Sequence, residues 1–399
     1  MQELNLPSSK SISNRLLIIQ YLSKSNKSIN NLSQADDTKL LQNALKQIDK
    51  YPEELVFTND AGTVTRFIIS LLALKQGIWS IDASTKMRER PIKPLLEALE
   101  NLGAEIKYLE IQYRLPIKVN GGKLIGGKTI KVNSRLSSQF LSSLLLVSPY
   151  IEGGLIIDTS DHITSKPYLQ MTIDLIKEFG AKLEQKNSLL IISPSKYEFR
   201  ETYVENDWSS ACFAYEKLCI MRRGEIFIKN LHNNSLQADS IAQKYFSYLG
   251  IKSKFIDNRL VISYNEEYIT KEKRILFDIK DCPDIFPSLL VSSLFSGKKV
   301  SFSGIESLKY KESNRIESMM EGLGELGAKV YLEDDRFIVN GFNSKEFVNK
   351  PLVIKTYDDH RIAMAFGVLS LKYPNIQIDN MECVSKSFPG FWENIYKII

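Results

Sequence analysis

Residues 319–332 read MMEGLGELGAKVYL, a pattern of amphipathic helix, glycine and strand that occurs three more times along the chain. The other copies are LLEALENLGAEI at 95–106, MTIDLIKEFGAKL at 171–183 and AQKYFSYLGIKSKF at 242–255. The apolar residues have helical spacing, and glycine readily ends a helix in the left-handed conformation. Their glycines, at 103, 180, 250 and 327, are about 70 to 77 residues apart. The interval exceeds that of common solenoids and predicts a larger repeated unit.

A second pattern consists of a polar or charged entry followed by a helical run that is apolar nearly all round. Its six copies are SISNRLLIIQYL (11–22), GTVTRFIISLLAL (62–74), SSQFLSSLLLVS (137–148), DWSSACFAYEKL (207–218), PDIFPSLLVSSLF (283–295) and DDHRIAMAFGVLSL (358–371). Helices of this kind are expected inside a domain. Short alternating or β-branched segments predict strands at 79–82, 128–132, 189–192, 225–228, 260–262 and 299–302. Together the patterns predict an α/β protein with six βαβαββ repeats, three in each of two domains.

The length and composition agree with two soluble domains. The chain has 399 residues, of which 43% are hydrophobic and 25% charged, too many residues for one ordinary core. The polar segment 203–207 divides the repeats evenly and is the expected linker.

The chain gives no sign of a nucleic-acid, membrane or metal function. Its net charge of +5 is spread out, without a basic run typical of a nucleic-acid arm. The apolar run 16–22 is far too short to span a membrane. Four cysteines and three histidines lack the spacing of a disulfide framework or a metal site. We therefore expect a cytoplasmic protein without a metal.

Groups that attract anions recur where the predicted buried helices begin. Lys10 and Arg15 flank the first start, and Arg66 and Arg361 lie in the second and sixth helices. Gly62 offers free backbone N–H groups, and residues 137–139 offer hydroxyls and an amide. Cations oppose the helix dipole at this end unless an anion binds there. The recurrence predicts a site for a strongly anionic ligand between the domains.

Further cations lie in loops. The segment 86–90 carries three, and Lys386 adds one near the C-terminus. Taken alone, Lys386 or Arg66 is equally explained as a surface cation.

The segment 308–316, LKYKESNRI, combines cations with one carboxylate. Lys311 and Arg315 are four residues apart at the start of a predicted helix, 316–326, that ends before Gly327. Like charges at this spacing repel each other. Glu312, between them, is the carboxylate available for proton chemistry. A solvated charge run is the alternative interpretation.

These residues resemble the EPSP synthase (3-phosphoshikimate 1-carboxyvinyltransferase) family of enolpyruvyl transferases over nearly the whole chain. The motifs that carry the resemblance are LPSSKSISNR (6–15), DAGT (60–63) with Arg66, ERP (89–91), SSQF (137–140), SKPY (165–168), PD (283–284), KE (311–312) with Arg315, DHR (359–361) and KSFP (386–389). The resemblance implies a two-domain inverse α/β barrel with its active site in the interdomain cleft. Residues 8–205 would form the shikimate 3-phosphate domain. Residues 206–399, with 1–7 packing on them, would form the domain of phosphoenolpyruvate and the catalytic groups.

The resemblance also implies a reaction. The enolpyruvyl group of phosphoenolpyruvate is transferred to the 5-hydroxyl of shikimate 3-phosphate, which gives 5-enolpyruvylshikimate 3-phosphate and phosphate. This step lies on the shikimate pathway to chorismate and the aromatic amino acids. The family needs neither metal nor organic cofactor, and we expect a monomer.

The resemblance assigns site residues by their roles. The catalytic set is Asp284, Lys311, Glu312, Lys10 and His360. The shikimate 3-phosphate set is Lys10, Ser11, Arg15, Ser137, Ser138, Gln139, Ser165, Asp284 and Lys311. The phosphoenolpyruvate set is Lys10, Gly62, Arg90, Gln139, Arg315, Arg361 and Lys386.

The catalytic roles divide between two sides of the reaction. Asp284 and Lys311 belong to the 5-hydroxyl side, and how they share the role of base stays open. Glu312 is assigned to proton transfer at carbon. His360 would assist at the phosphate, or would simply be a hydrogen-bonded histidine at a helix start.

Three positions depart from the family pattern, and two other functions compete. Ser8 replaces a glycine, and Asp60 and Ser307 replace asparagines. An acid at Asp60 would repel phosphoenolpyruvate unless it is paired. The sister enzyme that acts on UDP-N-acetylglucosamine relies on a cysteine in the arginine-bearing loop, whereas residues 84–94 contain none. A non-catalytic anion-binding relative would have lost its acid and base residues, which are present here.

Overall fold

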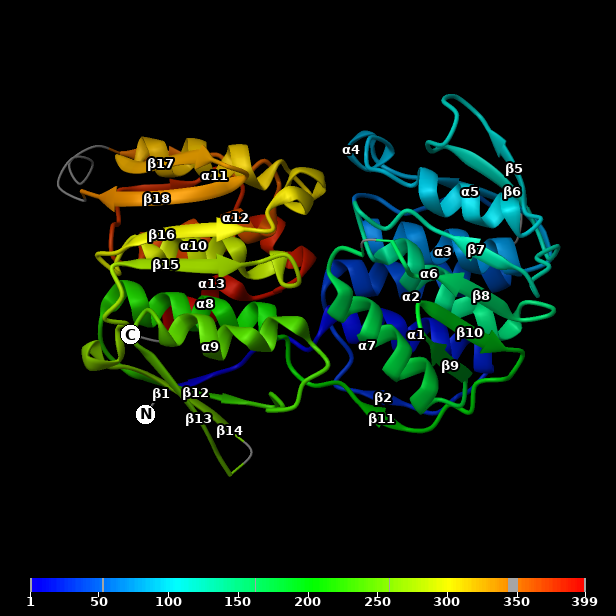
Figure 1. The fold of residues 1–399 in the computed structure, drawn as a ribbon, viewed down its shortest axis with the longest axis horizontal. Coiled ribbons are helices and arrows are strands. Elements are labelled where there is room, and N and C mark those ends of the chain that lie inside the picture. The colour runs from blue at the N-terminus through cyan, green and yellow to red at the C-terminus, as the bar shows by residue number, and fades with distance from the viewer. Residues whose placement is uncertain (1, 52–53, 162, 258, 344–350, 398–399) are drawn as a thin grey trace. The chain divides into compact units, whose positions relative to one another are not determined.

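The computed structural model describes residues 2–51, 54–161, 163–257, 259–343 and 351–397. The chain forms two compact units (Figure 1). Residues 10–204 form the first, called here the N-terminal unit, and residues 1–9 with 205–399 form the second, the C-terminal unit. The chain therefore passes between the units twice.

The N-terminal unit contains two four-stranded sheets and their helices. Its elements are α1 (Lys10–Ser23), β2 (Ile29–Asn30), α2 (Asp36–Lys50), β3 (Val56–Phe57), α3 (Gly62–Leu74), β4 (Gly77–Asp82), α4 (Thr85–Arg88), α5 (Lys93–Asn101), β5 (Glu105–Tyr108), β6 (Ile117–Gly121), β7 (Thr129–Lys131), α6 (Gln139–Val147), β8 (Leu155–Asp158), α7 (Lys166–Glu178), β9 (Lys182–Lys186), β10 (Leu189–Ser193) and β11 (Thr202–Tyr203). The sheet orders are β3-β4-β6-β5 and β7-β8-β10-β9.

The C-terminal unit repeats this plan. Its elements are β1 (Gln2–Leu4), α8 (Trp208–Met221), β12 (Glu225–Lys229), α9 (Ala242–Ser247), β13 (Ile251–Ile256), β14 (Arg259–Tyr264), β15 (Arg274–Asp278), α10 (Phe286–Ser293), β16 (Lys299–Ser303), α11 (Arg315–Glu325), β17 (Ala328–Glu333), β18 (Arg336–Phe342), β19 (Leu352–Ile354), α12 (His360–Ser370), β20 (Ile376–Ile378) and α13 (Phe391–Lys397). Its four-stranded sheets have the orders β1-β12-β14-β13 and β15-β16-β18-β17.

All four large sheets are built in the same way. Two strands pair in parallel, and a hairpin then adds two antiparallel strands. The predicted strands at 79–82, 189–192, 225–228, 260–262 and 299–302 are confirmed as parts of β4, β10, β12, β14 and β16, and the one at 128–132 is confirmed as β7, which it exceeds by one residue at each end.

Two of the six repeats differ from the predicted βαβαββ plan. Among the described residues, β11 pairs only with β2, and β19 only with β20. The chain continues from β2 through α2 to β3, and from β20 towards α13, so neither repeat shows a closing hairpin in the described part of the chain. The described residues therefore contain four complete repeats and two shortened ones.

The four repeated glycines end their helices with a positive φ angle, as the sequence predicts. Gly103, Gly180, Gly250 and Gly327 have φ angles of 101°, 96°, 92° and 74°. Each follows a helix and precedes a strand. Residues with side chains seldom adopt this conformation, so glycine fixes the place where each surface helix turns into its hairpin.

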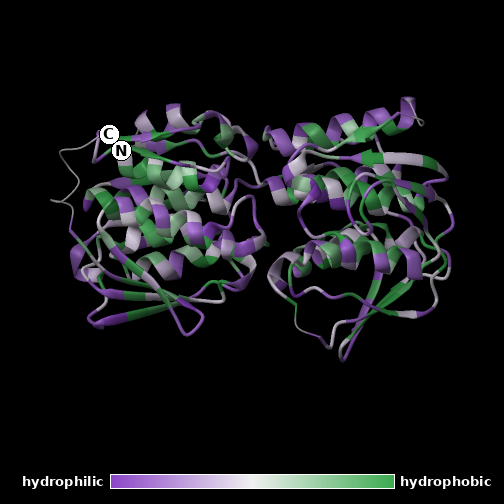
Figure 2. Ribbon diagram, turned by 90° about the horizontal axis from the view of Figure 1, so that it is seen from above, coloured by the Kyte–Doolittle hydropathy of each residue, from purple (hydrophilic) through white to green (hydrophobic). Residues whose placement is uncertain are grey.

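The helices with apolar residues on all sides are buried, as predicted. In the N-terminal unit α1, α3 and α6 pack against one another, and in the C-terminal unit α8, α10 and α12 do so. Every residue of α10 is buried, as is every residue of α8 except Met221. Figure 2 shows hydrophobic residues along the inner helices of each unit. None of the six has an acidic residue in its first turn.

The N-terminal segment belongs to the core of the C-terminal unit. Strand β1 pairs in parallel with β12, with Glu3 opposite Phe227. Leu4 and Leu6 lie in the same hydrophobic core as α8, α10 and α12. None of the helices in the described part of the chain is long and apolar enough to cross a membrane.

Glu216 is a carboxylic acid inside the helix core of the C-terminal unit. It lies on α8, is fully buried, and neither of its carboxyl oxygens has a hydrogen-bond partner among the described residues. Burial therefore raises the pKa of Glu216 well above its usual value. The neutral acid is the form compatible with this core.

We predict that Glu216→Gln stabilises the protein at neutral pH. A raised folded-state pKa means that stability is complete below the unfolded pKa of about 4.3 and is lost as pH rises toward the folded pKa. The glutamine cannot ionise, so at about pH 7 denaturant unfolding should show a gain of at least about 1 kcal/mol. The gain should shrink toward pH 4.

The exposed Glu225→Gln on β12 is the matched control and should change stability little. A pH-independent effect of Glu216→Gln would contradict the assignment.

Candidate active site

Arg315 is the centre of a charge cluster in the C-terminal unit. It is the first residue of α11, and its side chain is only 1% exposed. Its Nε donates to Asp359 Oδ2 at 2.8 Å, its Nη1 to Asp284 Oδ1 at 3.0 Å, and its Nη2 to Glu312 Oε2 at 2.8 Å. One guanidinium thus holds three carboxylates from three separate segments. The alternative of a solvated charge run for 308–316 is therefore wrong.

Asp284 joins the cluster to two more cations. It precedes α10 and accepts hydrogen bonds from Lys311 Nζ at 3.2 Å and from Arg361 Nη2 at 2.9 Å. Burial alone would raise the pKa of Asp284, but the charges of Arg361, Lys311 and Arg315 together hold it well below its usual value. Asp284 is therefore ionised at neutral pH.

The start of α12 completes the cluster. Asp359 caps the helix by accepting from Arg361 N at 3.0 Å, and it is fully buried against Arg315. His360 is buried at the first helical position. Lys386 Nζ lies 4.0 Å from Glu312 Oε1 and is 14% exposed, so the interpretation of Lys386 as a surface cation is wrong.

The sequence reasoning missed two acids of this unit. Asp359 belongs to the DHR motif without an assigned role, although its place before a helix start is a signal for a cap. Asp239, which accepts a hydrogen bond from the hydroxyl of Ser209, had no local signal. Burial, followed by the negative charge of Asp284, raises the pKa of Asp239 to about 7, while Arg361 acts in the opposite direction.

In the N-terminal unit, the side chains of Arg66 and Arg90 lie against Gly62. A Cβ on Gly62, at the start of α3, would lie 2.7 Å from Nη1 of both Arg66 and Arg90. Arg66 Nη1 also donates to Gln139 Oε1 at 2.6 Å, and Gln139 Nε2 donates to Thr63 Oγ1 at 2.9 Å. The starts of α3 and α6 therefore meet here. Arg66 is buried, which corrects its alternative interpretation as a surface cation.

Arg15 is a buried cation held by neutral groups. Its Nε donates to Thr172 Oγ1 at 2.7 Å, and its Nη atoms donate to the backbone oxygens of Ser11 and Tyr168 at 2.8 and 3.1 Å. Burial lowers the pKa of Arg15 to about 10. None of its hydrogen bonds within the described residues goes to a carboxylate, so an anion bound beside it would be strongly favoured.

The other predicted residues of this unit lie at helix starts. Lys10, the first residue of α1, pairs with Asp37 at 2.8 Å, a partner that the sequence did not reveal. Ser137 accepts from Gln139 N at 3.2 Å, and the buried Ser138 precedes α6. Ser165 precedes α7 in the left-handed conformation, with φ at 55°.

Two of the three departures from the family pattern have local contacts, whereas nothing in the structure explains Ser307, whose buried hydroxyl has no hydrogen-bond partner among the described residues. The carboxylate of Asp60 accepts a hydrogen bond from the hydroxyl of Ser84. Ser8 forms an isolated bridge with Asn206. In the arginine-bearing loop, Arg88 pairs with Asp82 and Glu110 rather than joining Arg66 and Arg90. Within the described residues, no group of three acidic, thiol or imidazole side chains is arranged to hold a metal ion.

Comparison with known proteins shows the family of the chain. The model of the family described as EPSP synthase (3-phosphoshikimate 1-carboxyvinyltransferase) matches residues 1–395. The chain belongs to the EPSP synthase family. The predicted resemblance is thereby confirmed.

Individual relatives agree with the family. The 3-phosphoshikimate 1-carboxyvinyltransferase of Bacteroides fragilis strain YCH46 is 34% identical over 395 residues, which covers 99% of this chain and 94% of the relative. The enzyme of the same name from Buchnera aphidicola subsp. Cinara cedri is 32% identical and covers the same shares. The solved EPSP synthase of Acinetobacter baumannii superposes with a TM-score of 0.74 at 18% identity, covering 99% of this chain and 95% of that one. The last comparison shows the shared fold.

We predict that Arg315→Met strongly destabilises the C-terminal unit. The substitution keeps an apolar stem but leaves the buried carboxylate of Asp359 without its cation. Removal of one partner of a buried ion pair typically costs about 3–5 kcal/mol. Denaturant unfolding at neutral pH measures the loss.

Lys355→Met provides the control, because Lys355 forms an exposed pair with Glu321 at 3.0 Å. Loss of an exposed pair costs about 1 kcal/mol or less. Equal effects of the two substitutions would show that Arg315 does not organise the cluster.

Proposed function

We propose that the chain catalyses the reaction of its family, transfer of the enolpyruvyl group of phosphoenolpyruvate to the 5-hydroxyl of shikimate 3-phosphate with release of phosphate. Family membership over almost the whole chain supports the reaction. The observation that carries the proposal is the network of Asp284, Lys311, Glu312 and Arg315, which combines acid, base and anion-binding groups. The reaction belongs to the shikimate pathway and takes place in the cytoplasm.

Shikimate 3-phosphate is proposed to bind mainly through the N-terminal unit. Arg15 supports this role, because its guanidinium is held by neutral oxygens and gains from an anionic partner. Hydroxyl and amide groups at the helix starts would add hydrogen bonds to phosphate and ring. The proposed set is Lys10, Ser11, Arg15, Ser137, Ser138, Gln139 and Ser165, with Asp284 and Lys311 at the 5-hydroxyl.

Phosphoenolpyruvate is proposed to bind where cations meet at helix starts. Gly62 leaves room for the guanidinium groups of Arg66 and Arg90, and the free N–H groups of α3 begin there. Arg315, Arg361 and Lys386 would contribute from the C-terminal unit. Arg315 makes four hydrogen bonds to carboxylates with its five N–H groups, and Nη1 makes only one of them, so the second N–H of Nη1 would be the group that contacts the substrate.

The proposed chemistry uses two protein groups in turn. Asp284, ionised beside three cations, accepts the proton of the 5-hydroxyl with Lys311 next to it. The 5-oxygen then bonds to C2 of phosphoenolpyruvate while Glu312 donates a proton to C3. Breakage of the bond from C2 to the phosphate oxygen releases phosphate, and Glu312 takes a proton back from C3. His360 is proposed to assist at the departing phosphate.

The direct test of the function is phosphate release. Purified protein should release phosphate only when shikimate 3-phosphate and phosphoenolpyruvate are both present, and neither substrate alone should suffice. An assay of inorganic phosphate measures this. Failure with that pair, together with release when UDP-N-acetylglucosamine replaces shikimate 3-phosphate, would overturn the proposal.

A second prediction concerns Glu312. Glu312→Gln keeps the size of the side chain and its contact with Arg315 but removes the transferable proton. Turnover should fall by about two orders of magnitude or more, because general acid–base catalysis contributes about that much. Shikimate 3-phosphate affinity, measured by calorimetry, should be retained.

Glu317→Gln is the matched control, since Glu317 is an exposed acid in the first turn of α11, the helix that follows Glu312. Its turnover should match that of the wild type. Normal turnover of Glu312→Gln would remove Glu312 from the chemistry.

A further inference from the structure

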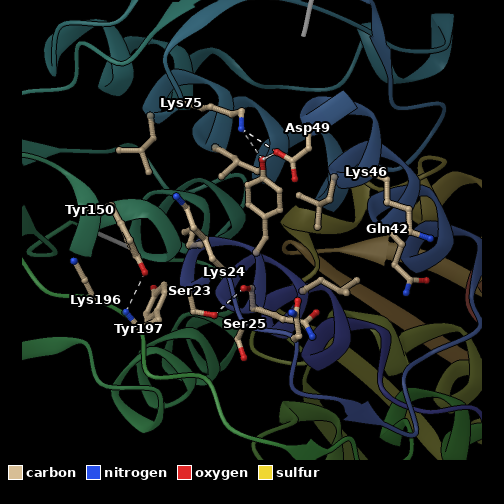
Figure 3. A pocket seen from close by; sticks show the side chains of 18 residues that line it. Ser23, Lys24, Ser25, Gln42, Lys46, Asp49, Lys75, Tyr150, Lys196 and Tyr197 are labelled. Atoms are coloured by element: carbon tan, nitrogen blue, oxygen red, sulfur yellow. Dashed lines mark hydrogen bonds and ion pairs between the residues drawn. The ribbon is translucent and has the colours of Figure 1, made fainter. Parts of the chain in front are cut away.

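A pocket of about 1100 Å³ opens in the N-terminal unit, at the C-terminal ends of α1 and α3 (Figure 3). It is lined by Ser23 at the end of α1 and by Lys75 just after α3. Lys10, in contrast, begins α1. A helix of this length spans about 20 Å, so the pocket is far from the residues proposed to bind substrate.

The pocket has an apolar and aromatic lining. Leu17, Leu45, Leu71 and Leu74 contribute aliphatic surface, and three tyrosines, including Tyr150 and Tyr197, contribute rings. Leucine and tyrosine lining of this extent is typical of sites for small organic molecules, as is the volume.

The charged groups of the pocket are mostly positive. Four lysines (Lys24, Lys46, Lys75 and Lys196) and a single acid, Asp49, lie in its wall. In Figure 3, Lys46 and Lys196 lie on opposite sides of the pocket with Lys24 between them. The wall therefore carries a formal excess of three positive charges.

The single acid is already engaged. Asp49 Oδ1 accepts from the Tyr21 hydroxyl at 2.6 Å and from Lys75 Nζ at 3.0 Å, and Lys75 also donates to the Tyr21 hydroxyl at 3.0 Å. Within the described residues, Lys24, Lys46 and Lys196 form no ion pair with a carboxylate. Asp49 also interacts electrostatically with Lys24, so this single acid is shared among several cations and the pocket keeps a positive excess.

Helix capping explains only part of this charge. Lys24 and Lys75 directly follow α1 and α3, where a cation is favourable beside the negative end of the helix dipole. Lys46 lies within α2, and Lys196 lies in the loop after β10. Their convergence on one pocket from separate segments requires another explanation.

We infer that this pocket binds a small organic anion, a molecule with a flat apolar ring and one acidic group. The leucines and tyrosines would contact the ring, while Lys24, Lys46 and Lys196 would surround the acid. This site is independent of the proposed reaction, because it lies at the opposite ends of the helices that carry Lys10 and Gly62.

The test uses a dye of this chemistry, 8-anilinonaphthalene-1-sulfonate, whose fluorescence rises in an apolar environment. Wild-type protein should bind it saturably at one site per chain. The Lys46→Met, Lys196→Met double variant keeps the apolar stems and removes two charges, and it should weaken binding by about fivefold or more. Saturating shikimate 3-phosphate should not displace the dye, and phosphate release by the variant should equal that of the wild type.

Two controls make the result specific. Lys107→Met with Lys128→Met removes the same charge from exposed positions outside the pocket and should leave dye affinity unchanged. N-phenyl-1-naphthylamine, which lacks the sulfonate, should bind the wild type and the pocket variant equally. Unsaturable dye binding, equal weakening by both double variants, or displacement by shikimate 3-phosphate would overturn the inference.

Discussion

Three helices in each unit are buried along most of their length, and this burial determines where charged groups can lie. Their sides pack into apolar cores, so polar groups of these helices emerge mainly at the ends. At the starts, free N–H groups and the helix dipole favour anions. Arg15, Gly62, Gln139, His360 and Arg361 all lie in these first turns or close to them. At the other ends of α1 and α3 the lysine-lined pocket occurs.

The buried arginines of the two units have different hydrogen-bond partners. In the C-terminal unit, the buried arginines form ion pairs with carboxylates: Arg315 with Asp284, Glu312 and Asp359, and Arg361 with Asp284. These acids offset most of the positive charge before any ligand binds. In the N-terminal unit, Arg15 rests on hydroxyl and carbonyl oxygens. A nearly neutral network of acids and bases suits proton transfer, whereas an uncompensated guanidinium suits a phosphate or carboxylate. The proposed division of roles follows from this difference.

The sequence predicted what depends on local pattern. Helix periodicity and the left-handed glycines, such as Gly103 and Gly327, act within a few residues, so the repeats and the buried helices could be anticipated. The missing hairpins after β2 and β20 could not, because a repeat interval does not show which copies are shortened. The family motifs assigned the proposed site residues, and the periodic placement of cations and N–H donors at helix starts pointed to an anion.

Ion pairs and hydrogen bonds between residues far apart in the sequence could not be predicted from local pattern. Asp37 for Lys10 and Asp239 beside Ser209 meet only in the folded chain. Arg66 and Lys386 have no local feature that distinguishes them from surface cations, and only packing shows that Arg66 is buried and that Lys386 is largely covered. Arg315 looked like a cation repelled by Lys311, yet the structure surrounds it with three acids. Local spacing showed the repulsion, and tertiary structure supplied the compensation.

The central claim is that this chain transfers a three-carbon enol group rather than a phosphoryl group. The most direct measurement uses phosphoenolpyruvate labelled with ¹⁸O in the oxygen that joins C2 to phosphorus, together with shikimate 3-phosphate. Attack of the 5-oxygen at C2 breaks the carbon–oxygen bond, so mass spectrometry should find the label in the released phosphate. Label retained on the three-carbon fragment would mean that the phosphorus–oxygen bond breaks, and would contradict the account.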